Sequence, residues 1–265
     1  MPSLHQAQRP FQDPFRSWKQ SLTRILNMKP RQASMVWLEP GRVHAGGAVL
    51  PFPGGDPGPV LARGLAGLPP GPSCWVVDDD WIPCLLVRDL AELPAGTEAR
   101  EAYFQWRFSQ ILGAEPARFV QALPLGGSLW LLAGVAQELR ETWIHAAAAG
   151  GHPIRSLVPR WLWLYNRLAP SFQAPGLLLS LRPDGSGGYS GTLAAWGGQL
   201  GVLRQWTDPA SPELWNQDRM LPTLAYLQRE GHPAREVHLW GAQAWPELPL
   251  PIRILPVEIP AQEPL

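Results

Sequence analysis

An ordered succession of segments within residues 74–168 constrains the fold of this chain more than any single residue does. Apolar runs, polar breaks and turn residues predict a strand, a helix, a hairpin, a second helix, a second strand and a third helix. The clearest helix covers residues 97–113, where Thr97 is placed to cap the first turn and Gly113 to end the helix. Its expected apolar face comprises Ala99, Tyr103, Phe104, Trp106, Phe108 and Ile111. A Gly-Gly pair at 126–127 predicts a tight hairpin. Alternating strands and helices indicate an α/β fold.

Shorter elements flank this series. A first hairpin is expected to turn near Pro40 and Gly41, and the last third begins a second cycle of strands and helices. Within that cycle, a helix at residues 213–231 is expected to be interrupted near Pro222. We therefore predict two related α/β halves behind an amino-terminal arm, with these bounds: the arm at 1–33, a first lobe with an inserted subdomain at 34–170, and a second lobe at 171–265.

Composition excludes several classes of function. The chain has 265 residues, of which 45% are apolar and 17% charged, and its formal net charge is zero. Because no global field attracts nucleic acid, we expect none as a partner. No apolar stretch approaches the ~20 residues that span a bilayer, and the amino terminus lacks the apolar core of a signal peptide, so we expect a cytoplasmic protein. Cys74 and Cys84 are expected to be reduced.

The 14 tryptophans are the main oddity of composition. Trp75, Trp143 and Trp161 lie inside apolar strands or helices, so we interpret the tryptophans as core residues. A carbohydrate-binding module stays open as an alternative, and it requires a row of exposed rings. Residues 15–26 combine apolar side chains at helical spacing with Arg and Lys, which predicts an amphipathic helix. That helix either docks on its own domain, stays a mobile arm or touches a membrane surface.

Asp78, Asp79 and Asp80 are the candidate metal ligands, because clustered carboxylates suit hard cations. Adjacent residues of a strand point to opposite faces, however, so three in a row rarely converge on one ion. We therefore expect a solvated strand end and no metal. Elsewhere, spacing alone assembles no nucleophile, base and orienting acid for catalysis.

The order of segments resembles the PilM family of type IV pilus assembly proteins and, by extension, the cytoplasmic domain of the type II secretion platform protein GspL. In that family a strand bearing an Arg leads to an acidic helix with a Trp, and a hairpin, a glycine-ended helix, a strand and a helix follow. The matching segments are LLVRDLAELP, EAREAYFQWRFSQILG, FVQALPLGGSLWLLAGV and AQELRETWIHAAAAGGHPIRSLVPRWLWLYNRL. The resemblance covers residues 34–258. It implies an α/β, actin-like (ribonuclease H-like) two-lobed fold with mixed sheets flanked by helices.

The resemblance also implies positions for a nucleotide. An actin-like fold holds ATP and magnesium between its halves by glycine turns and acidic residues. In this chain the first acid is Glu instead of Asp, a Pro removes a backbone donor beside it, and Ala replaces one glycine of the nucleoside turn. The Gly-rich loop DGSGG also fits an ordinary hairpin turn. The residues in the family's cofactor positions are Glu39, Gly41, Asp184, Gly185 and Gly241.

The resemblance implies a scaffold that is cytoplasmic and peripheral to the inner membrane. Its partner would be the amino-terminal cytoplasmic tail of a bitopic inner-membrane pilus or secretion protein, held in a groove of the first half. We expect a degenerate nucleotide site, no cofactor and no enzyme activity, with ATP and magnesium left open. The alternative is an active actin-like ATPase or small-molecule kinase, which requires Glu39 and Asp184 to approach one cleft.

Overall fold

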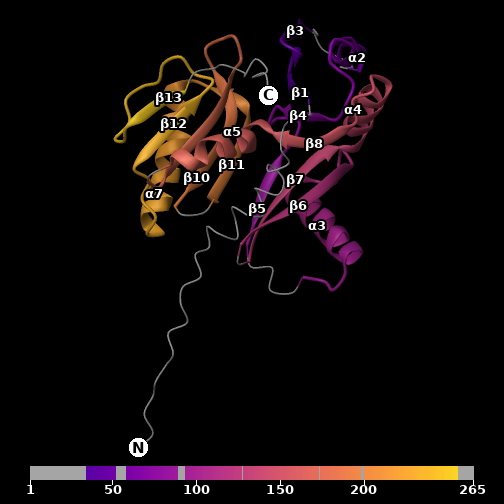
Figure 1. Ribbon diagram of the computed structural model, residues 1–265. Coiled ribbons are helices and arrows are strands. Elements are labelled where there is room, and N and C mark those ends of the chain that lie inside the picture. The colour runs from indigo at the N-terminus through magenta and orange to yellow at the C-terminus, as the bar shows by residue number, and fades with distance from the viewer. Residues whose placement is uncertain are drawn as a thin grey trace, which may run out of the picture.

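The computed structural model describes residues 34–51, 58–88, 93–126, 128–172, 174–197 and 200–255 (Figure 1). Their strands form two five-stranded sheets and one three-stranded sheet, with helices packed against them. None of the helices in these ranges is both long enough and apolar enough to cross a membrane. The amphipathic helix expected at residues 15–26 lies outside the described residues.

The first sheet has the strand order β3-β2-β1-β4-β8. β1, β2 and β3 form an antiparallel meander, whereas β1, β4 and β8 run parallel. The turn between β1 and β2 falls at Pro40 and Gly41, which confirms the predicted first hairpin. Helices α2 and α4 pack together beside the sheet, and α5 follows β8 directly. The bounds are β1 Ser34–Glu39, β2 Arg42–Ala45, β3 Ala48–Pro51, β4 Ser73–Val77, β8 Ile154–Pro159, α2 Gly58–Ala66, α4 Gln137–Ala149 and α5 Arg160–Leu168.

The second sheet repeats this arrangement, with the order β11-β10-β9-β12-β13. β9, β10 and β11 are antiparallel neighbours, and β9, β12 and β13 run parallel. The predicted second cycle is therefore confirmed, because each sheet joins an antiparallel meander to two further parallel strands. The bounds are β9 Gly176–Pro183, β10 Tyr189–Trp196, β11 Leu200–Ala210, β12 Glu236–Trp240 and β13 Ile252–Leu255.

The helical segment of the second half changes its winding along its length. A short α6, Pro212–Leu214, leads into a π-helical turn, Trp215–Met220, and α7, Leu221–Arg229, completes the segment. Pro222 is the second residue of α7 and follows the π-helical turn almost directly. The predicted interruption near Pro222 is thus the wide turn just before it.

A small sheet is inserted between β4 and β8 of the first half. Its order is β5-β7-β6, and α3 packs on it through Phe104 and Phe108. Gly134 of β7 is necessary for this contact, because a Cβ there would lie 2.6 Å from the Phe108 ring. The bounds are β5 Cys84–Val87, β6 Arg118–Gly126, β7 Leu129–Ala136 and α3 Thr97–Leu112.

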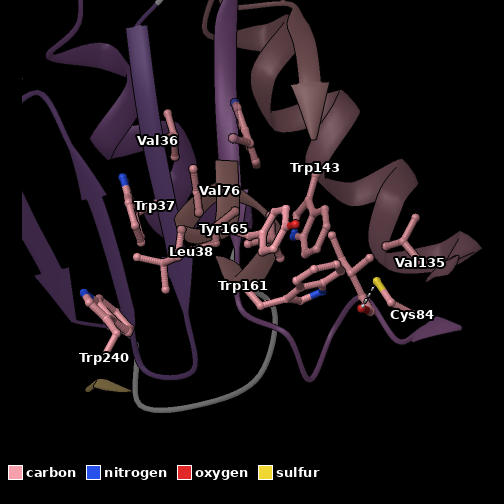
Figure 2. Close-up of a cluster of buried hydrophobic side chains, with 14 of the residues drawn as sticks. Val36, Trp37, Leu38, Val76, Cys84, Val135, Trp143, Trp161, Tyr165 and Trp240 are labelled. Carbon is pink, nitrogen blue, oxygen red and sulfur yellow. Dashed lines mark hydrogen bonds between the residues drawn. The ribbon is translucent and has the colours of Figure 1, made fainter. Parts of the chain in front are cut away.

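The main core spans both five-stranded sheets, and tryptophans fill much of it (Figure 2). Trp75, Trp143 and Trp161 have no exposed surface, which confirms their interpretation as core residues. Trp37 of β1 stacks on Trp240 of β12, with ring centroids 6.3 Å apart. This contact joins the two halves, since each half contributes one ring.

Two expectations for α3 were wrong. The helix begins at Thr97, but no side chain caps it. Trp106 and Ile111, expected on the apolar face, are 52% and 50% exposed. The reason is that one narrow face of α3 meets the small sheet, and Phe104 and Phe108 already fill it.

Candidate functional site

A cleft of about 610 Å³ lies between the first and second sheets. β1, β2 and the start of α5 supply part of its wall, and β9, β10 and the end of β12 supply the rest. Of the predicted nucleotide positions, Glu39 and Gly241 line this cleft, whereas Gly41, Asp184 and Gly185 are not among the lining residues. The side chains that give the cleft its chemistry are Glu39, Arg42, His44, Arg160, Arg182, Tyr189, Trp240 and Gln243.

Glu39 is the last residue of β1, and its Oε1 lies 3.4 Å from Nε2 of His44 on β2. Burial raises the pKa of Glu39, but His44 and the positive charges of Arg160 and Arg42 together hold that pKa below its ordinary value. Glu39 is therefore an anion at neutral pH. In the described part of the chain, no three His, Cys, Asp or Glu side chains gather as a metal site needs.

Two of the three predicted turn glycines, Gly41 and Gly241, are required by the backbone of the fold. Gly41 has a φ of 83° in the hairpin turn between β1 and β2, a conformation that favours glycine. Gly241 has a φ of 93°, and a Cβ there would lie 1.9 Å from the carbonyl oxygen of Leu181. Close approach of the chain after β12 to β9 therefore requires glycine, whether or not a nucleotide binds.

Asp184 and Gly185 form the hairpin turn between β9 and β10. Oδ1 of Asp184 accepts hydrogen bonds from the amides of Ser186 and Gly188, and Oδ2 accepts from the Ser186 hydroxyl. The hydroxyl and amide of Ser186 hold the pKa of Asp184 below its ordinary value. Its carboxylate thus stabilises its own turn, as the hairpin interpretation of DGSGG predicts.

A buried ion-pair network at the cleft corrects the expectation for the three aspartates. Asp78 is 1% exposed, so it is not part of a solvated strand end. Its Oδ2 accepts from Nη1 of Arg160 at 2.8 Å, and its Oδ1 accepts from Nη1 of Arg182 at 3.2 Å. Arg182 also pairs with Asp80, and Nε of Arg160 donates to the hydroxyl of Ser180. The first sheet, α5 and β9 are joined through these side chains.

Asp79 anchors the start of α5. Its Oδ1 accepts from the amide of Trp161 at 2.9 Å, so it occupies the anion-binding end of the helix. Burial, together with the charge of Asp78, raises the pKa of Asp79 to about 6, although Arg160 opposes the shift. The sequence does not reveal the roles of Asp78 and Asp79, because Arg160 and Trp161, which bond to them, lie 82 residues further along the chain.

A second candidate site is a groove of about 860 Å³ in the first half. It lies between α3, the small sheet and the β8–α5 connection. Its surface is mainly apolar, with acidic Glu98 and Glu101 in the wall that α3 forms. The apolar lining residues include Phe104, Phe119, Val120, Ala122, Leu131, Leu157 and Leu162.

No family model matches the chain, and no curated protein matches it in sequence. Among solved structures it is similar to one described as a PilM-PilN type IV pilus biogenesis complex, with a TM-score of 0.54 and 14% identity over 80% of this chain and 82% of that chain. The chain has the actin-like fold. A second similar structure is the cytoplasmic domain of EpsL, an inner-membrane component of the type II secretion system of Vibrio cholerae, with 14% identity, a TM-score of 0.46 and coverage of 83% and 85%.

In this actin-like fold, one carboxylate, that of Glu39, lines the cleft between the halves. Three arginines, Arg42, Arg160 and Arg182, line it as well, but Arg160 and Arg182 already pair with Asp78 and Asp80. Magnesium needs oxygen ligands that converge, and the carboxylate of Asp184 is held within its own turn. The residues present therefore do not fit the magnesium that an actin-like ATPase uses.

Proposed function

We propose that the chain is a scaffold component of a type IV pilus or related secretion platform, and that it docks the amino-terminal tail of an inner-membrane partner. The likeness to a chain of the PilM-PilN complex supports the class of machine. The apolar groove beside the small sheet is the observation that carries the docking role. A protein held by such a tail would work on the cytoplasmic side, peripheral to the inner membrane.

The chemistry of the groove favours a peptide over a small polar ligand. Trp130, Leu157 and Leu162 are partly buried and supply apolar surface from three different elements, which is how peptide grooves gain affinity. Glu98 and Glu101 add negative charge at the wall. A tail that carries apolar side chains and a positive group would complement both features.

We propose further that the cleft is a degenerate nucleotide site and that the protein is not an enzyme. The network of Asp78, Arg160 and Arg182 supports this proposal, because it connects the halves with protein charges alone. The alternative, an ATPase or small-molecule kinase, draws support from the arginines and aromatic rings that line the cleft.

Binding of a tail peptide tests the docking role. The probe is a synthetic peptide with the cytoplasmic sequence that precedes the transmembrane helix of a bitopic inner-membrane protein encoded beside this chain. Phe119→Ser removes a ring that lines the groove and is 42% exposed, and Leu221→Ser is a matched control at 41% exposure in the second half. We expect micromolar binding that Phe119→Ser weakens and the control leaves unchanged. No binding by the unmodified protein at micromolar concentration would overturn the proposal.

A further inference from the structure

β6 is an edge strand of the small sheet, because the strand order is β5-β7-β6. In an antiparallel pair, alternate residues turn their N–H and C=O groups toward the partner strand, and the residues between them turn these groups away. Just before β6, the carbonyl of Ala117 accepts from the amide of Gln137, the residue that directly follows β7. Because this alternation has a period of two and Ala117 bonds toward β7, the odd-numbered residues of β6 turn their N–H and C=O groups toward β7. Val120 and Ala122 therefore turn their N–H and C=O groups outward.

Two other observations give the same alternation. Gly134 pairs in register with Val120, yet its amide donates to Pro83 on the β5 side, so it does not bond to β6. Pro124, which has no N–H, occupies an outward position of β6. Proline is tolerated within a sheet where its missing donor would face away from the partner strand. The outward direction of Val120 and Ala122 thus has three independent supports.

The two edges of the small sheet differ in what covers them. At the β5 edge, the outward amide of Cys84 donates to Oε1 of Gln205 on β11 at 2.6 Å, and Arg88 donates to the carbonyl of Gly201. That edge is therefore covered by the second half. Among the described residues, no strand lies against the outer edge of β6. Val120 and Ala122 instead line the groove between α3 and α5.

We propose that the partner segment enters the groove as an extended strand and pairs with β6 through the outward N–H and C=O groups of Val120 and Ala122. The inference rests on the proposed function and specifies the form of the bound tail. Strand addition to an exposed edge supplies main-chain hydrogen bonds, while the groove receives alternate side chains. Glu98 and Glu101 outnumber Arg100 along the groove, so the segment carries a positive group toward α3.

A second copy of this chain fits the edge less well. Side chains of α3 and of α5 line the same groove as Val120 and Ala122, so the free edge lies between two helices. A single extended chain can reach such an edge, whereas pairing of two β6 strands would bring α3 of each copy against the other. Edge-to-edge dimers are therefore an outcome that the test must separate from tail binding.

The test combines one variant pair with hydrogen exchange on the unmodified protein, and the tail peptide defined above is the probe. Val120→Pro removes the outward amide without removing a hydrogen bond to β7, and Val120→Ala keeps the amide while shortening the side chain. We expect Val120→Pro to bind the peptide about tenfold more weakly than Val120→Ala. In the saturated complex, exchange at the amides of Val120 and Ala122 should slow by about tenfold or more, whereas the amide of Gln121 is already protected.

The possible outcomes distinguish strand addition at β6 from the docking role itself. Peptide binding that leaves exchange at Val120 and Ala122 unchanged would overturn strand addition and keep the docking role. Absence of binding by the unmodified protein would overturn both. If exchange at these two amides slows as the protein concentration rises, in the absence of peptide, the strand that pairs with β6 belongs to a second copy of this chain and not to the tail. If Val120→Pro fails to fold, the exchange measurement on the unmodified protein still decides.

Discussion

Arg182 of β9 donates from Nη1 to Oδ1 of Asp78, which follows β4, and this bond connects the second sheet to the first. Asp78 also accepts from Arg160, so one buried carboxylate pairs with two guanidinium groups. Since each arginine comes from a different element, this one side chain links the first sheet to both α5 and the second sheet.

Removal of that carboxylate charge should destabilise the fold. Asp78→Asn leaves Arg160 buried without its anion, so we expect the free energy of unfolding to fall by about 3 kcal/mol. Urea unfolding at neutral pH measures the change. Glu230→Gln is the control, because Glu230 pairs with Arg229 at the surface, and we expect a change below about 1 kcal/mol. Equal losses in the two variants would contradict the role of the network.

The raised pKa of Asp79 predicts a pH dependence with a definite sign. Its ordinary pKa is 3.8 and its pKa in the folded chain is about 6, so between these values the folded chain binds the proton more strongly than the unfolded chain does. This group therefore contributes less stability as the pH rises from about 4 to 6. Other groups titrate in the same range, so the informative quantity is the difference between the unmodified protein and Asp79→Asn. We expect the unmodified protein to lose stability relative to the variant between pH 5 and pH 7. A constant difference in urea unfolding across that range would exclude this assignment.

Gly241 should be intolerant of any side chain. Gly241→Ala would place a Cβ 1.9 Å from the carbonyl oxygen of Leu181, so we expect a loss of more than about 2 kcal/mol in the free energy of unfolding. Gly231→Ala is the matched control, because Gly231 has a φ of 79° but nothing within 4 Å of its Cβ position. The control should cost about 1 kcal/mol, the conformational term alone. Similar losses at both positions would show that the close approach to β9 is not limiting.

A nucleotide titration separates the scaffold from the enzyme alternative. We expect ATP with magnesium at about 1 mM to leave the melting temperature unchanged, because the carboxylate of Asp184 is committed to its own turn. A rise in melting temperature that Asp184→Ala abolishes would instead restore a catalytic site at the DGSGG loop. A rise that survives Asp184→Ala but is lost in Arg182→Gln would indicate an anion site that does not use the loop.

The order of elements could be predicted from the sequence because local patterns determine it. The hairpin turning at Pro40 and Gly41 and the helix after Pro159 depend on neighbours in the chain, and both are present. Burial of Asp78 could not be predicted in this way, since its arginine partners lie 82 and 104 residues away. A run of three acids predicts solvent exposure unless those partners are known.

In the candidate sites, too, local features could be predicted and long-range contacts could not. Glu39, at the end of the first strand, lines the cleft, and its role there stays a prediction. The exposed face of α3 was not predictable, because helical spacing groups Trp106 with Phe104 and Phe108 but does not reveal how narrow the facing sheet is. The free edge of β6 likewise depends on which strands pair, and a strand sequence does not contain that information.

The shared strand order of the two large sheets has an evolutionary consequence. If the halves descend from one duplicated unit, the inserted small sheet and α3 interrupt the first copy between β4 and β8, whereas residues 241–251 make the matching connection in the second copy. The proposed docking groove then lies largely on the insertion, whereas the ion pairs between the halves lie outside it. Mutations confined to that insertion could therefore change the binding partner while the two large sheets and the contacts between them stay the same.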